Sequence, residues 1–267
     1  MEKVRVVIGH TLASYCFPNS IVIDPVGLPP LPLRKVEIGD KELPLVPILV
    51  ERCPPESECV ELQVEGVVKE GDAEEKACGN FNCQKPWPLR WLERDKWYLV
   101  TRLKVEPKNL RLLNSKLKRI DLEEGKVYLS GLRQLEFEEL VWTAPYPVLS
   151  KLLNLKEPRR LKATVSIAQG RCNNGIYFHF GKGNPILSFI CLNGTVISVA
   201  PGAVDGRNAL ERLVKKGYLK EVSRATSYLI DYYALEDVRV ERIEGIELYG
   251  RTAQWKEMGL EDVMKCA

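Results

Sequence analysis

Apolar residues alternate with polar ones, or form short runs, over most of this chain, and three segments before the C-terminal region show helical spacing. Short apolar runs bounded by glycine, proline or asparagine predict strands. The expected strands are 3–9, 20–24, 96–105, 126–129, 161–166, 175–180, 186–192, 195–199, 222–231 and 244–249, with a strand pair in 59–68 and a hairpin near 38–40. Helical spacing occurs in 11–17, 148–153 and 208–216, and Gly217 is placed to end the last helix. The pattern predicts a strand-rich α/β chain.

The end of the chain, residues 250–267, combines a glycine-arginine pair with later aromatic and acidic residues before a short helix. This ending resembles the C-terminal flavin-contacting segment of the FAD-dependent amine oxidase, UDP-galactopyranose mutase-like and protoporphyrinogen oxidase-like superfamily. The matching residues are Gly250, Arg251, Trp255, Lys256, Met258 and Asp262. Ala253 stands where the family usually has a second glycine. Residues 139–153 resemble the family strand that runs into a Thr-x-Pro turn beneath the cofactor, with Thr143 in that turn.

The N-terminal segment departs from this family. A first strand ending at Gly9 suits a dinucleotide-binding unit, in which a Gly-x-Gly-x-x-Gly turn lets a pyrophosphate approach the backbone. Here only Gly9 is kept, and His10 and Thr11 follow it. Asp24 ends the second strand, where such units use an acid to bind ribose hydroxyls, but it lies closer to the turn than usual. Either the loop contacts phosphate through hydroxyl groups, or the cofactor site has been lost.

The resemblance implies an α/β (α+β) fold. A reduced, Rossmann-like FAD/NAD(P)-binding domain is expected from 1–40, 99–155 and 240–267, intertwined with an antiparallel, substrate-type sheet domain from 41–98 and 156–239. FAD is the implied cofactor. The residues expected to contact it are Gly9, His10, Thr11, Asp24, Thr143, Gly250, Arg251, Trp255 and Met258. Two of these have structural alternatives: His10 as a helix cap, and Arg251 as the partner of Glu247 or Glu261.

Two functions follow. The first is a small flavoprotein oxidoreductase with an unassigned small-molecule substrate, in which the cofactor carries the redox chemistry. The second is a non-catalytic derivative of the fold that has lost FAD and binds a protein partner as an interaction or scaffold subunit. Nucleotide-sugar mutase activity is not expected, because 183–189 contain no arginine for a substrate diphosphate. Catalytic residues stay unassigned. The chain contains only two histidines, His10 and His179, and we interpret His179 as a hydrogen-bonded residue on a sheet face.

The composition indicates which partners and which cellular compartment to expect. The 39 basic and 36 acidic residues leave a net charge of +3, so nucleic acid is not an expected partner. No apolar stretch is long enough to predict a membrane span. The chain enters a strand almost at once, which leaves no room for a signal peptide, so a cytoplasmic location is expected. Abundant charged residues and 17 prolines are typical of a hyperthermophile.

The eight cysteines fall into two classes. Four are closely spaced, and they suit two disulfides, free thiols or a weaker alternative, a four-thiolate zinc site. These four are Cys53, Cys59, Cys78 and Cys83. The other four are isolated, and we expect them to be free, buried residues. These are Cys16, Cys172, Cys191 and Cys266.

Overall fold

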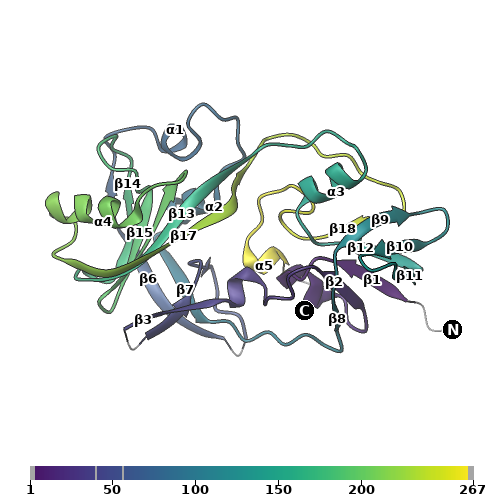
Figure 1. The fold of residues 1–267 in the computed structure, drawn as a ribbon. Helices are drawn as coiled ribbons and strands as arrows, with labels where there is room; N and C mark the ends of the chain where they lie inside the picture. Colours follow the sequence, from purple (N-terminus) through teal and green to yellow (C-terminus); the bar gives the residue numbers. More distant parts are fainter. Residues whose placement is uncertain (1–3, 40, 56, 264–267) are drawn as a thin grey trace. The chain divides into compact units, whose positions relative to one another are not determined.

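A computed structural model describes residues 4–39, 41–55 and 57–263, and most of its elements are labelled in Figure 1. The chain folds into two compact units. Unit 1 contains the residues up to Leu31, Val105–Pro158 and the residues from Val238 onward, and unit 2 contains Pro32–Lys104 and Arg159–Asp237. Each unit is therefore assembled from separate pieces of sequence.

Unit 1 is built on a parallel sheet of five strands in the order β18-β12-β1-β2-β8. The strands are β1 (Arg5–Ile8), β2 (Ile21–Asp24), β8 (Arg111–Asn114), β12 (Glu139–Trp142) and β18 (Glu247–Leu248). The two central strands, β1 and β12, are apolar and buried, as expected for a parallel sheet covered on both faces. Strand order runs outward in opposite directions from β1 and β12. This pair is therefore a topological switch point, where ligands bind in open α/β sheets.

The connection from β1 to β2 contains only a short helix, as the sequence suggests. The expected helix 11–17 is a 3-10 helix of five residues, η1 (Leu12–Cys16). Pro18 and the left-handed Asn19 (φ 59°) stop it, because the chain must enter β2 at Ile21. A full crossover helix, which would cover the sheet, is thus replaced by one buried turn.

The rest of unit 1 is small. An antiparallel sheet contains β9 (Leu117–Asp121), β10 (Lys126–Leu129) and β11 (Gln134–Glu136). Two helices complete the unit, α3 (Tyr146–Leu152) and the short α5 (Leu260–Val263).

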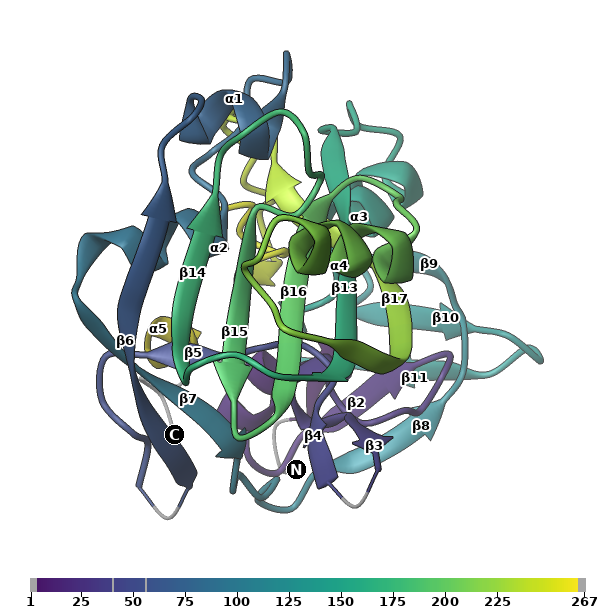
Figure 2. The ribbon, with the colours of Figure 1, turned by 90° about the vertical axis from the view of Figure 1, so that its left-hand side faces the viewer.

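Unit 2 is a curved sheet of eight strands in the order β17-β13-β16-β15-β14-β6-β7-β5, most of which are visible in Figure 2. Its strands are β5 (Leu49–Val50), β6 (Glu58–Val68), β7 (Lys96–Arg102), β13 (Arg160–Gly170), β14 (Gly175–His179), β15 (Ser188–Leu192), β16 (Thr195–Pro201) and β17 (Val222–Leu235). All neighbours are antiparallel except β14 and β6.

The expected strand pair in 59–68 is wrong, because β6 is one continuous strand. Its first half pairs with β7 and its second half with β14. Gly66, the residue able to turn the chain, instead makes room for the ring of Tyr177. Its lack of a side chain serves packing there.

Helices and a hairpin cover parts of the unit 2 sheet. Helix α4 (Gly206–Lys215) lies against β13 and β17 (Figure 2) and is capped by Asp205, which accepts a bond from the Asn208 amide. The other elements are η2 (Leu31–Leu33), the hairpin of β3 (Lys35–Ile38) and β4 (Lys41–Pro44), α1 (Ala73–Cys78), α2 (Trp87–Arg90) and η3 (Trp91–Glu93). The Trp87 and Trp91 rings, 5.1 Å apart, pack together. Within the described ranges, no helix has both the length and the apolar character needed to cross a bilayer.

The four closely spaced cysteines form two disulfides. The pairs Cys53–Cys59 and Cys78–Cys83 are bonded, which decides against free thiols at these four positions. No cluster of described residues could hold a metal ion, so the zinc alternative finds no support in that part of the chain. The expectation for three isolated cysteines is wrong: Cys172 is bonded to Cys191, and Cys16 is also disulfide-bonded. Cys266 lies outside the described residues.

Candidate functional site

The expected site residues of the N-terminal segment meet at the carboxyl edge of the unit 1 sheet. Gly9 has a φ of 101°, and a Cβ placed on it would lie 2.6 Å from the Ala144 amide nitrogen. Thr143 fixes this approach, because its amide donates to Ile8 O at 2.9 Å and its hydroxyl to Gly9 O at 2.7 Å. A side chain at Gly9 would push the two loops apart. The glycine that the sequence retains is therefore required by the contact between β1 and β12.

Asp24, at the end of β2, stabilises the same edge through hydrogen bonds to backbone amides. One carboxylate oxygen accepts the His10 amide at 3.1 Å, and the other accepts the amides of Val26 at 2.8 Å and Gly27 at 3.0 Å. A carboxylate offers about four acceptor positions. Three are used by the protein's own backbone, so at most one is left for a ribose hydroxyl.

The contacts of His10 do not suit a residue that binds phosphate. Its Nδ1 lies 2.9 Å from Leu28 O, and its ring packs at 5.8 Å from that of Tyr15. The imidazole thus fastens the loop after β2 to the loop after β1. Neither interpretation from the sequence included this contact.

The start of η1 carries unused donors. Thr11 occupies the N-cap position, but its hydroxyl caps nothing. Its Oγ1 is buried and has no hydrogen-bond partner within the described part of the chain. The amides of Leu12 and Ala13, the first of the turn, also lack an acceptor there. Trp142, the last residue of β12, has a buried indole nitrogen in the same condition.

The C-terminal segment closes over this turn. Gly250 has a φ of 95°, and a Cβ there would lie 2.8 Å from the Ala13 methyl. Arg251 forms a two-point pair with Glu257, at 2.9 and 2.6 Å, a partner that the sequence did not suggest. Trp255 is only 2% exposed and adopts a positive φ of 53°. Met258 is partly buried. The segment that the sequence assigned to flavin contacts is packed on the protein itself.

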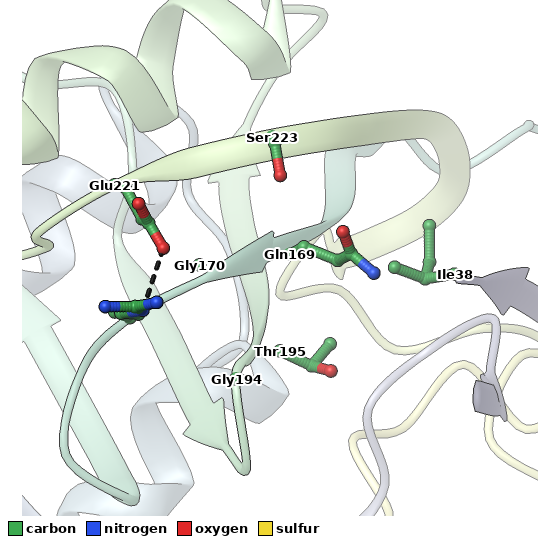
Figure 3. Close-up of a pocket in the computed structure, with 8 residues that line it drawn as sticks. Ile38, Gln169, Gly170, Gly194, Thr195, Glu221 and Ser223 are labelled. Carbon is green, nitrogen blue, oxygen red and sulfur yellow. Dashed lines mark ion pairs between the residues drawn. The ribbon is translucent and has the colours of Figure 1, made fainter. Parts of the chain in front are cut away.

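Unit 2 contains a separate cavity, drawn in Figure 3. Its volume is about 240 Å³, and its lining residues are Ile38, Gln169, Gly170, Arg171, Gly194, Thr195, Glu221 and Ser223. Gln169 lies between Thr195 and Ser223, its partners on the neighbouring strands. The exposed Arg171 pairs with Glu221 at 2.9 Å. Sequence reasoning missed this cavity, because alternating polar residues on a strand resemble an ordinary solvated face.

Sequence comparisons give no match, either to a protein-family model or to a curated protein. Solved structures do match. A reduced UDP-galactopyranose mutase superposes with a TM-score of 0.63 at 10% identity, over 96% of this chain and 90% of that one. An oxidoreductase from Methanosarcina mazei gives 0.53 at 10% identity, over 93% and 94%. A flavin-dependent halogenase from Brevundimonas sp. BAL3 gives 0.53 at 9%, over 96% and 67%.

The chain has the FAD/NAD(P)-binding fold. This confirms the fold class expected from the sequence, and at such low identity the likeness extends to the fold alone. In this fold a dinucleotide lies at the switch point of the parallel sheet. The edge formed by Gly9, Thr11, Asp24 and Thr143 occupies that position.

Proposed function

We propose that unit 1 binds FAD at the carboxyl edge of its parallel sheet, and that the protein is a small flavoprotein oxidoreductase. One observation carries the proposal. In unit 1, the buried side-chain polar atoms that lack a hydrogen-bond partner within the described residues belong to Thr11 and Trp142. Both residues adjoin the carboxyl ends of β1 and β12. Buried polar atoms are nearly always hydrogen-bonded. Unpaired donors at a ligand-binding edge therefore support the binding of a ligand that supplies the acceptor.

The donor set fits a diphosphate. The Thr11 hydroxyl and the amides of Leu12 and Ala13 would donate to its oxygens, and the remaining acceptor position of Asp24 would take a ribose hydroxyl. Hydroxyl and amide donors would thus do the work that a glycine-rich turn does by close approach. Bound FAD would supply electron transfer, and the protein would supply binding and orientation.

Access to these donors requires a movement. Because Thr11 Oγ1 is buried and Gly250 packs directly on Ala13, the diphosphate would reach η1 only after the Gly250 turn moves away from it. The Arg251–Glu257 pair lies within this segment, so it can move with the segment unbroken. We therefore expect slow uptake of FAD.

The test begins with protein purified without added cofactor. Its visible spectrum is recorded, and the supernatant released by heating is analysed by mass spectrometry. A flavin spectrum with stoichiometric FAD supports the proposal. Colourless protein is next incubated with FAD and monitored by quenching of flavin fluorescence. Failure in both experiments would refute FAD binding.

A second candidate function is a cofactor-free derivative of the fold that binds a protein partner. The closed packing favours it: Asp24 serves three backbone amides, Arg251 is neutralised by Glu257, and Trp255 is buried. A colourless protein that never takes up FAD, yet unfolds cooperatively, would support this candidate. The substrate of the first candidate and the partner of the second are both unassigned.

A further inference from the structure

Two lysines from different elements of unit 2 border one turn. The turn, residues 181–184, joins β14 to β15. Lys76 of α1 donates from Nζ to Gly181 O at 2.7 Å and also to Asn184 O. Lys216, which follows α4, has its Nζ 3.0 Å from the position that a Cβ on Gly183 would occupy. Both ammonium groups therefore lie beside the same four residues.

The lysines around this turn outnumber the carboxylates that face them. Neither Lys76 nor Lys216 forms an ion pair with a carboxylate in the described part of the chain. Lys182, in the turn itself, has only a long and exposed contact with Glu75 at 3.8 Å. The nearby Glu70 carboxylate faces Gly181, with Oε2 2.8 Å from the Cβ position of that glycine. One ammonium group is left uncompensated even when both carboxylates are counted.

A buried histidine faces the same turn. His179 is 1% exposed, and neither ring nitrogen has a partner within the described residues. The expectation of a hydrogen-bonded sheet-face histidine is therefore wrong. Its Cε1, the carbon between the two nitrogens, lies 2.8 Å from the Cβ position of Gly181, and its ring meets Tyr218 edge-on at 5.4 Å. The polar edge of the ring is directed at the turn.

The electrostatics agree with this geometry. Burial, and then the charges of Lys76 and Lys216, lower the pKa of His179. Burial and the charge of Lys216 lower the pKa of Lys76 to about 8. A negative ion over the turn would oppose both effects.

We propose that Lys76 and Lys216, with the 181–184 turn, form a binding site for a tetrahedral oxyanion of the phosphate or sulfate class. Lys76 uses two of its three N–H donors on the turn, which leaves one for a ligand, and Lys216 forms no ion pair with any residue that the structure describes. Gly183 lies directly beside the Lys216 ammonium, which would have to shift if that residue carried a Cβ. Lysine binds phosphate as a point charge. The site lies wholly within unit 2 and is independent of FAD binding.

The first test compares two lysine variants. Lys216 and Lys215 are adjacent, exposed and equally charged, but only Lys216 borders the turn. Binding of inorganic phosphate is measured by calorimetry and thermal unfolding at pH 7, against sodium chloride at equal ionic strength. We expect phosphate, but not chloride, to raise the Tm. Lys216→Gln should weaken phosphate binding at least tenfold, and Lys215→Gln should leave it within twofold.

The second test observes His179 directly. The chain has two histidines, so His10→Gln assigns both imidazole signals in an NMR titration. At a phosphate concentration that just saturates the wild type, the pKa of His179 should rise in the wild type and in Lys215→Gln, and should rise less in Lys216→Gln. Phenyl phosphate distinguishes the ligand source. Tighter binding than inorganic phosphate indicates the phosphate group of a larger molecule, and equal binding indicates the free ion. Equal Tm effects of phosphate and chloride, or equal losses in both lysine variants, would overturn the site.

Discussion

Replacement of Thr11 by valine should have two effects of opposite sign. Valine has nearly the shape of threonine, and Thr11 has an extended backbone (φ −114°, ψ 170°) that suits a β-branched residue. Burial of a polar group without a partner costs about 1–3 kcal/mol. Because the hydroxyl caps nothing, Thr11→Val should stabilise the cofactor-free protein by about 1 kcal/mol or more. Its Tm would rise by about 2–4 °C for each kcal/mol.

The same change should weaken FAD binding. A hydrogen bond to a charged group contributes about 1.5–3 kcal/mol, and tenfold in Kd corresponds to about 1.4 kcal/mol. Loss of the Thr11 hydroxyl should therefore raise the Kd for FAD by about 10–100-fold. The assays are differential scanning calorimetry of the cofactor-free protein and a flavin fluorescence titration.

Thr164→Val is the matched control. Thr164 is also buried, but its hydroxyl donates to Gly202 O at 2.9 Å and accepts the Val204 amide at 3.0 Å. The same chemical change should destabilise the protein there by about 1–3 kcal/mol, with no effect on FAD affinity. If Thr11→Val destabilises as Thr164→Val does, then the Thr11 hydroxyl has a structural partner. If it stabilises but leaves the Kd for FAD unchanged, the hydroxyl does not contact the cofactor.

Three further predictions address stability. A Cys172→Ala/Cys191→Ala variant should lose about 3 kcal/mol in urea unfolding, because this disulfide closes a loop with a sequence separation of 19, and equal stability would contradict this. Arg251→Met should cost about 2 kcal/mol by removing the guanidinium that pairs with the Glu257 carboxylate, in a site where the two side chains are 19% and 10% exposed. The double variant with Glu257→Met should recover at least half of that lost stability, and no recovery would refute the contribution of this ion pair. The lowered pKa of His179 means that the unfolded chain binds more protons as pH falls below about 6.5, so stability should fall on acidification and His179→Gln should reduce that slope.

Most strands could be predicted from the sequence because their cause is local. Alternation and apolar runs predicted β13 to β17, and Asn and Gly turns separated them. The errors arose where a local signal had a tertiary use. The segment 59–68 was expected to form a strand pair, but it is one continuous strand, and Gly66 within it makes room for the Tyr177 ring. The isolated Cys172 and Cys191 looked like unpaired residues because their proximity depends on the pairing of β14 with β15, which places Cys191 opposite Gly175, close to the loop that contains Cys172.

The candidate site was only partly predictable. The position of Gly9 and Asp24 at strand ends follows from the alternation of strand and turn, since parallel strands end at one edge of a sheet. Their hydrogen bonds do not follow, because a carboxylate accepts backbone amides and ribose hydroxyls equally well. The cluster around His179 was also invisible in the sequence. Lys76 and Lys216 lie 140 positions apart and meet only because α1 and α4 both reach the same turn.

The glycines that this chain retains show which positions of the fold need glycine for packing rather than for cofactor binding. A dinucleotide-binding turn uses its later glycines to admit phosphate, and those are the ones missing here. Gly9 and Gly250 remain, and each has a structural need: Gly9 for the Ala144 backbone, and Gly250 for Ala13. Retained glycines therefore cannot serve as support for FAD. The unpaired Thr11 hydroxyl can, because a protein that no longer bound a ligand would gain stability by replacing it with valine.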